Sequence, residues 1–142
     1  NHYEFLLLPD KFSFEVIEYG ITSNGFWHDY EGFEGRTSYA ESVTGAYYAN
    51  RLAITEYLGR IQRQAQCIVF REIRPEYNAP LGVGILRQIS REAFSKQAER
   101  FATKEEALAQ MQTRLHTPLE RFLIHSLIFR EFGKQARLSK FF

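Results

Sequence analysis

The chain has 142 residues, of which 44% are hydrophobic and 25% are charged, and its formal net charge is +1. This length and composition predict one globular domain with a sizeable core and exclude an intrinsically disordered chain. The near-zero net charge excludes a protein that is held on nucleic acid by a global basic field, so any contact with DNA has to come from a local patch.

The single cysteine, Cys67, excludes an internal disulfide framework and a Cys–Cys zinc site. It lies in an apolar run, which predicts a buried and inert thiol and is compatible with the cytoplasm. No stretch of about 18 apolar residues is present, so we expect no membrane partner. The chain begins at Asn1 and enters an apolar run at once, which suggests a fragment or a processed piece.

Two strands are predicted at the start of the chain. Residues 3–8 form an apolar run that stops at the turn residues Pro9 and Asp10. Residues 12–19 alternate between apolar and polar side chains, as in a strand with one buried face, and Gly20 ends them. We expect these two strands to pair as a hairpin.

Residues 20–40 mix aromatic and acidic side chains without a period, so we expect a loop. It is either a functional lid or a loop pinned by its own aromatic residues. His28 is close in sequence to three acidic residues, Asp29, Glu31 and Glu34. Because no second His or Cys is nearby, we expect no metal site here.

A helix is predicted from Thr44 to Ala65, because apolar residues recur there at helical spacing and Thr44 can cap the start. Arg51 falls on or beside the apolar side of this helix. A buried or cleft-lining arginine needs partners, which makes Arg51 a candidate site residue. The alternative is an arginine that packs its stem and reaches water.

Residues 66–73 are short, apolar and rich in β-branched side chains, which predicts a central strand. Pro75 and Pro80 stiffen the loop that follows. Irregular loops that leave core strands often carry binding groups, so we predict a polar pocket here. Its members would be Arg51, Arg71, Glu72, Glu76, Tyr77 and Arg87.

This pocket leaves open whether the chain is an enzyme. Arginines can hold phosphate oxygens and a carboxylate pair can bind Mg²⁺, as in a nuclease-like, nucleic-acid-processing enzyme. Nuclease sites need several converging acids, however, and here arginine and glutamate alternate, so a structural Arg–Glu network is favoured.

A third hypothesis is a non-catalytic module that contacts DNA or RNA through a local basic patch, with Trp27 stacking on bases. A solvated surface of mixed charge is favoured over such a patch. The patch would contain Arg60, Arg63, Arg87, Arg91 and Arg100.

Three more helices are predicted in the second half of the chain. One spans residues 85–94, a short one is capped by Thr103, and the last begins at Thr117-Pro118 and ends at Gly133. The fold class is therefore α+β, with a small, mostly antiparallel sheet of about three or four strands packed by about four helices. We expect one domain over residues 1–133 and a flexible C-terminal tail over residues 134–142.

The tail has the pattern Gln-x-x-aliphatic-x-x-aromatic-aromatic, formed by Gln135, Leu138, Phe141 and Phe142. In one helical turn the three apolar side chains fall on one side, and Gln135 can form hydrogen bonds beside them. This pattern resembles the PCNA-interacting peptide (PIP box), which binds the DNA sliding clamp. Burial of three large side chains is worth roughly 5–9 kcal/mol before ordering costs, which predicts about micromolar affinity. The alternative is a tail that folds its two phenylalanines onto its own core.

Several short motifs follow one another along the chain. They are Gly35-Arg36, Tyr39-Ala40 and the segments 47–53, 63–65, 71–73, 76–77 and 80–83. Together they resemble the C-terminal half of the archaeal Nre DNA-repair family, and the resemblance covers essentially the whole chain. It implies a role in the DNA-damage response, with a terminal PIP box that binds PCNA and with DNA as a further partner.

Two departures affect what the resemblance implies about chemistry. The family carries Trp and then Arg-Glu after its Leu-Gly-Val, whereas this chain has Gly84 and then Arg87-Gln88. The family's zinc-finger-like cysteine cluster belongs to its other half, so the resemblance implies no cofactor in this chain. It therefore assigns no catalytic role to any single residue.

Overall fold

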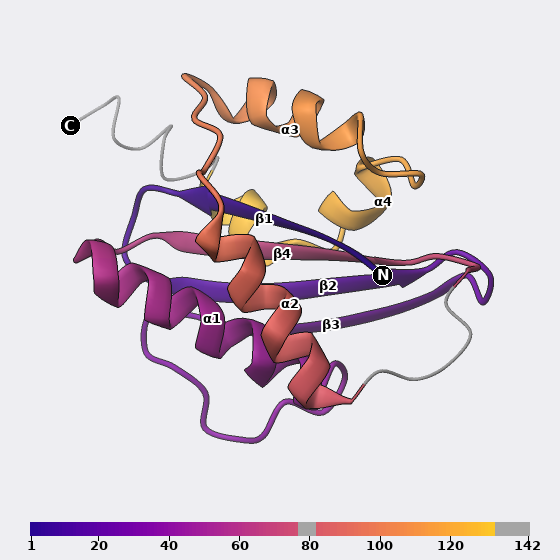
Figure 1. The fold of residues 1–142 in the computed structure, drawn as a ribbon, viewed down its shortest axis with the longest axis horizontal. Coiled ribbons are helices and arrows are strands. Elements are labelled where there is room, and N and C mark those ends of the chain that lie inside the picture. Colours follow the sequence, from indigo (N-terminus) through magenta and orange to yellow (C-terminus); the bar gives the residue numbers. More distant parts are fainter. Residues whose placement is uncertain (77–81, 133–142) are drawn as a thin grey trace.

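The computed structural model describes residues 1–76 and 82–132, in which a sheet lies between two layers of helices (Figure 1). The strands are β1 (His2–Leu8), β2 (Ser13–Gly20), β3 (Gly25–Glu31) and β4 (Gln66–Ile73). The helices are α1 (Gly45–Ile61), α2 (Val83–Ser95), α3 (Lys104–Gln112) and α4 (Glu120–Leu123). Residues 127–132 form a further helical segment.

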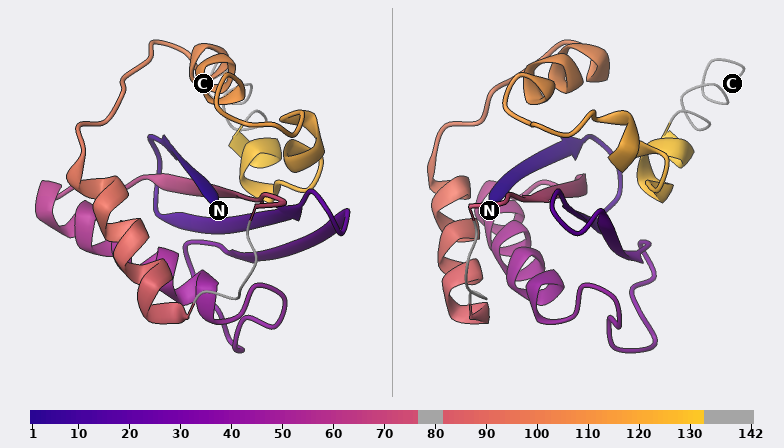
Figure 2. Two further views of the ribbon diagram at one scale, coloured as in Figure 1. Left: turned by 45° about the vertical axis from the view of Figure 1, so that its right-hand side comes forward. Right: turned by 90° about the vertical axis from the view of Figure 1, so that its right-hand side faces the viewer.

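The four described strands form one mixed sheet in the order β1-β4-β2-β3. β4 is antiparallel to β1 and parallel to β2, and β3 is antiparallel to β2. Figure 2 shows α1 and α2 on one side of this sheet and α3 and α4 on the other. The predicted α+β class is confirmed, and antiparallel pairs are the majority within a sheet that also contains a parallel pair.

The predicted hairpin between the first two strands is wrong, because β4 lies between them. The connection after β1 is tied to the segment that precedes β4, since the Phe12 backbone N–H donates to Gln64 Oε1 over 3.0 Å. Local alternation indicates that a segment is a strand, but it carries no information about the neighbour that the strand pairs with. A strand from later in the chain can therefore insert between two consecutive strands.

The predicted loop over residues 20–40 is also partly wrong, because its middle forms the edge strand β3. Two acidic residues of β3, Asp29 and Glu31, are 8% and 3% exposed. They face α1, and Asp29 accepts backbone hydrogen bonds from Ser42 and Val43. The strand is not recognisable from the sequence pattern, because the inward-facing residues of a strand are normally apolar and here they include two carboxylates.

Side chains of alternating strand positions fill two cores, one on each face of the sheet. The core under α1 and α2 contains Phe14, Val69 and Tyr47. The core under the C-terminal helices contains Phe70 and Phe122. Among the described residues, no helix combines the length and apolar character that crossing a membrane requires.

The last predicted helix is interrupted, because α4 stops at Leu123 and helical structure resumes at residue 127. Ser126 Oγ accepts a hydrogen bond from the backbone N–H of Phe129 and so caps the second segment. The predicted cap at Thr103 is confirmed by its bond from the backbone N–H of Glu106, whereas the Thr44 side chain makes no capping bond. Gly133, the predicted end of the last helix, lies outside the described residues.

Candidate functional site

The structure separates Arg71 from Glu72, which the sequence placed in one polar pocket. The two are neighbours on β4, so their side chains point to opposite faces of the sheet. Arg71 forms a buried ion pair with Glu18. Glu72 pairs with Arg74 at 2.8 Å and accepts a backbone hydrogen bond from Thr117 at 2.6 Å. These side chains therefore belong to two structural ion pairs.

Arg51 lies toward the other end of the sheet from Arg71. Its guanidinium donates two hydrogen bonds to Glu31, with Nη2 at 3.2 Å from Oε2. Glu31 is opposite Phe14 on β2, and Arg71 is opposite Glu18. These two β2 positions are four residue steps apart, which corresponds to about 13 Å along the strand.

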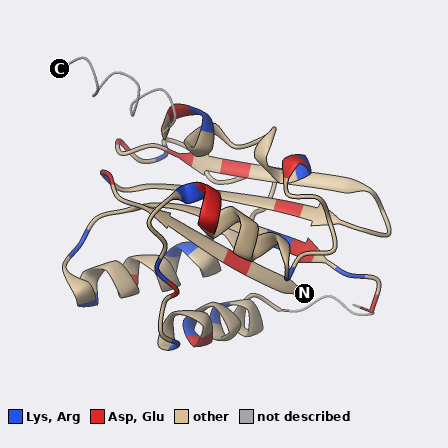
Figure 3. Ribbon diagram, turned by 90° about the horizontal axis from the view of Figure 1, so that it is seen from above, with Lys and Arg blue, Asp and Glu red and all other residues tan. Residues whose placement is uncertain are grey.

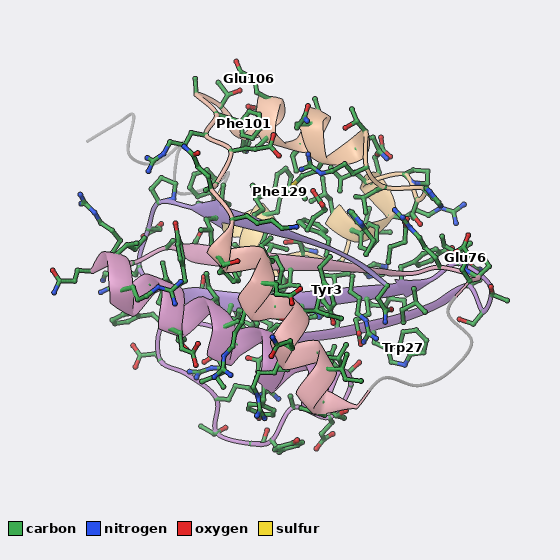
Figure 4. The ribbon with its side chains drawn as sticks, viewed as in Figure 1. Tyr3, Trp27, Glu76, Phe101, Glu106 and Phe129 are labelled. Carbon is green, nitrogen blue, oxygen red and sulfur yellow. The ribbon has the colours of Figure 1, made fainter. Side chains whose placement is uncertain are left out.

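The remaining predicted pocket members are on the surface or outside the described residues. Glu76 is exposed beyond the end of β4 (Figure 4), and Arg87 is exposed on α2. Tyr77 lies outside the described residues. The residues of the predicted clamp peptide also lie outside them, and these are Gln135, Leu138, Phe141 and Phe142.

Basic and acidic residues lie close to one another along the helices in Figure 3, whereas the charged residues of the strands are mostly acidic and buried. In the predicted basic patch, Arg91 pairs with Glu56 at 2.6 Å, and the Arg60 guanidinium lies 5.8 Å from the ring centre of Tyr57. Trp27 is 37% exposed on the edge strand β3. Arg60 and Arg91 therefore have partners within the protein, as expected for a solvated surface of mixed charge.

Six acidic side chains of the described sheet are buried, and each has hydrogen-bonding or ionic partners. Glu4 illustrates the balance: burial alone would raise its pKa, but hydrogen bonds from His2 and Arg114 outweigh burial and leave the pKa lowered. For Glu18, burial raises the pKa and Arg71 offsets it only in part. The six are Glu4, Glu15, Glu18, Asp29, Glu31 and Glu72.

Glu15 anchors the last described helical segment, residues 127–132. Its carboxylate is completely buried and accepts backbone hydrogen bonds from Leu127 at 2.7 Å and Ile128 at 3.3 Å. The same carboxylate lies 2.6 Å from His28 Nε2 on β3. The start of this helical segment is therefore held against the centre of the sheet.

A hollow of about 540 Å³, which we call the Arg51 hollow, lies beside the start of α1. Arg36 on its wall donates hydrogen bonds to the backbone carbonyls of Tyr30 (2.8 Å), Ser38 and Tyr39. Because Arg36 and Arg51 are both engaged by protein oxygens, they are poorly placed to capture a phosphate as well. The hydrogen bonds of Arg36 therefore hold the loop before α1 in place.

A second hollow, the β2–β4 cavity, lies on the opposite face, where β2 and β4 begin. Its volume is about 500 Å³. Ser13 Oγ and Gln66 Oε1 are buried in its wall, and neither has a hydrogen-bond partner among the described residues. The lining is completed by Asp10, Lys11, Phe12, Tyr30, Phe33, Leu127 and Glu131.

Sequence reasoning missed Ser13 and Gln66, since each stands at the start of a strand with no motif around it. They meet because Ser13 is the partner of Gln66 in the parallel β2–β4 register, which no local pattern predicts. Within the described ranges, no three His, Cys, Asp or Glu side chains are placed to hold a metal ion.

Comparison with known proteins finds a matching family model and curated relatives. The family model described as "Archaeal Nre, C-terminal" matches residues 31–141. DNA repair protein NreB of Archaeoglobus fulgidus is 40% identical over 117 residues, which is 82% of this chain and 29% of that protein. DNA repair protein NreA of the same organism is 31% identical over 150 residues, which covers 100% of this chain and 36% of that protein.

A third relative, DNA repair protein NreA of Haloferax volcanii, is 35% identical over 105 residues, which is 66% of this chain and 25% of that protein. The chain therefore spans about a third or less of the length of these curated relatives. No solved structure matches it significantly.

Proposed function

Because the chain belongs to the archaeal Nre family and matches its C-terminal part, we propose that it is a DNA-repair domain that tethers to the sliding clamp PCNA. The observation that carries the proposal is the sequence pattern of its final residues. The contacts to the clamp would be made by Gln135, Leu138, Phe141 and Phe142.

The chemistry of these residues suits a reversible tether. A tight turn would present Leu138, Phe141 and Phe142 together to an apolar groove, while Gln135 forms hydrogen bonds at its rim. Gross burial of roughly 5–9 kcal/mol, less the cost of ordering the peptide, is consistent with about micromolar binding. Binding of this strength recruits a repair domain without locking the clamp to it.

The anchoring of residues 127–132 by Glu15 supports this proposal. Gln135 follows Phe132, the last described residue, by three positions. Once the peptide is bound, so short a connection to a fixed helical segment would give the domain a high effective concentration for a second contact on the same assembly. Clamp binding would thereby hold this domain beside the DNA that the clamp encircles.

The test is a titration of purified clamp with the wild-type chain and with the Phe141→Ala, Phe142→Ala double variant, followed by calorimetry. Removing two buried phenylalanines is expected to weaken binding by at least a hundredfold, since each is worth roughly 1.5–3 kcal/mol. Ser139→Ala, at an unconstrained position of the pattern, is the matched control and should bind like the wild type. Equal affinity of the double variant and the wild type would refute the tether.

A further inference from the structure

We propose that the β2–β4 cavity receives a single unstacked nucleobase, stacked on its aromatic wall and read by Ser13 and Gln66. The inference rests on the proposed DNA-repair role, and it names the chemical group that this domain would recognise. No ion pair or hydrogen bond among the described residues accounts for Ser13 Oγ and Gln66 Oε1 in this cavity.

The unpartnered polar atoms point to a ligand that forms hydrogen bonds. Ser13 is 5% exposed and Gln66 is 8% exposed, and the described structure supplies no partner for Ser13 Oγ or Gln66 Oε1. Buried polar atoms without partners are uncommon, because each loses its bond to water and gains none in return. An amide oxygen accepts hydrogen bonds and a hydroxyl donates or accepts them, so the complementary ligand presents an N–H group beside a second polar atom.

The two groups are side by side, as reading one edge of a base requires. The parallel register pairs Ser13 with Gln66, so both side chains leave the same face of the sheet from adjacent strands. Every nucleobase offers an N–H donor and an acceptor along its pairing edge, and enzymes that extract a base read this edge in the same manner.

The rest of the lining matches a flat, neutral heterocycle better than a bare phosphate. Phe12, Tyr30 and Phe33 line the cavity, and Phe33 is 58% exposed at its mouth. Aromatic side chains bind bases by stacking. Asp10 and Glu131 stand in the same lining as Lys11, whose Nζ is 5.4 Å from the Phe33 ring centre. Two carboxylates against one ammonium disfavour a site for phosphate alone.

The position of the cavity links it to the proposed tether. Leu127 and Glu131 line the cavity and belong to the helical segment that Glu15 holds and that precedes the clamp peptide in sequence. Clamp binding would therefore bring the mouth of the cavity close to DNA. A volume of about 500 Å³ is within the range of pockets that hold small ligands.

The probe is a short single-stranded oligonucleotide with one 2-aminopurine, whose fluorescence reports stacking, and the protein is the full chain. Phe33→Ala is expected to weaken binding about tenfold, since one stacking partner is lost. Ser13→Ala and Gln66→Met should also weaken it, yet both should melt at the wild-type temperature or above it, because each removes a buried polar group that lacks a partner. Tyr39→Ala, which removes a 62% exposed aromatic residue from the Arg51 hollow, is the matched control.

An oligonucleotide of the same length made of abasic sugar-phosphate units separates base recognition from backbone contact, and it is expected not to bind. Wild-type affinity in Phe33→Ala and Ser13→Ala would overturn the proposal, as would equal binding of the abasic strand. Either result would mean that no base is bound in the cavity. The Phe141→Ala, Phe142→Ala variant should keep oligonucleotide binding, and the cavity variants should keep clamp binding, so the two proposals fail separately.

Discussion

Replacing Glu15 by alanine is expected to detach residues 127–132 from the sheet. The buried carboxylate accepts hydrogen bonds from Ser126 Oγ at 2.7 Å and from the backbone N–H groups of Leu127 and Ile128. Hydrogen bonds to a charged group contribute roughly 1.5–3 kcal/mol each. Because the segment can open locally once they are lost, the full sum is not expected. We expect a loss of about 3–5 kcal/mol, which is typical when one partner of a buried charged network is removed.

Urea unfolding followed by circular dichroism measures this loss, and hydrogen exchange at Leu127 and Ile128 locates it. The matched control is Glu15→Gln, which keeps the shape of the side chain and one acceptor oxygen but places an amide NH₂ group against some of the donors. Its free energy of unfolding should fall by less, about 1–3 kcal/mol. If Glu15→Ala unfolds within about 0.5 kcal/mol of the wild type, the size of an ordinary surface substitution, the anchoring argument is refuted.

Two further predictions concern other buried groups. Burial alone would raise the pKa of Glu72, but hydrogen bonds from Thr117 and Arg74 outweigh burial and hold it below its usual 4.5. A carboxylate with a lowered pKa stabilises the folded state at pH values above its usual pKa, and this stabilisation is lost as the pH falls through the pKa of the folded state. In the Glu72→Gln variant, the free energy of unfolding should therefore decline less steeply below pH 4.5 than in the wild type. Burial raises the pKa of the Cys67 thiol, so a disulfide reagent should modify it only in urea, and rapid reaction of the folded chain would contradict this.

Sequence periodicity predicted the elements in which most inward positions are apolar, although some of these elements also bury an acidic residue such as Glu15. It found β1, β2, β4 and the helices α1 to α3, because their inward positions follow the expected spacing. It missed β3, whose inward positions include Asp29 and Glu31. The groups that stabilise these carboxylates, such as Val43 N–H and the Arg51 guanidinium, come from later segments. A local pattern cannot include partners that only the fold brings close.

The predicted polar pocket contained an inconsistency that the sequence alone could have exposed. Residues 66–73 were expected to be a strand, and consecutive residues of a strand face opposite sides. Arg71 and Glu72 therefore could not both line one pocket if the strand continued through Ile73, as it does. The prediction that Arg51 needs a partner is confirmed by its ion pair with Glu31, a residue in a segment that the sequence predicts to be a loop.

The two proposed binding elements differ in how they are encoded, and this explains why they are detected by different means. A clamp peptide is a contiguous run of eight residues, 135–142, whose contacts depend on spacing alone, so it is legible in the sequence. The β2–β4 cavity is assembled from Ser13, Phe33, Gln66 and Leu127, which only the strand register and the helical anchor bring together. Because the two elements share no residue, substitutions can remove one and spare the other. A domain that still binds the clamp after losing Phe33 and Gln66, but no longer binds an unstacked base, would separate recruitment from recognition in this protein.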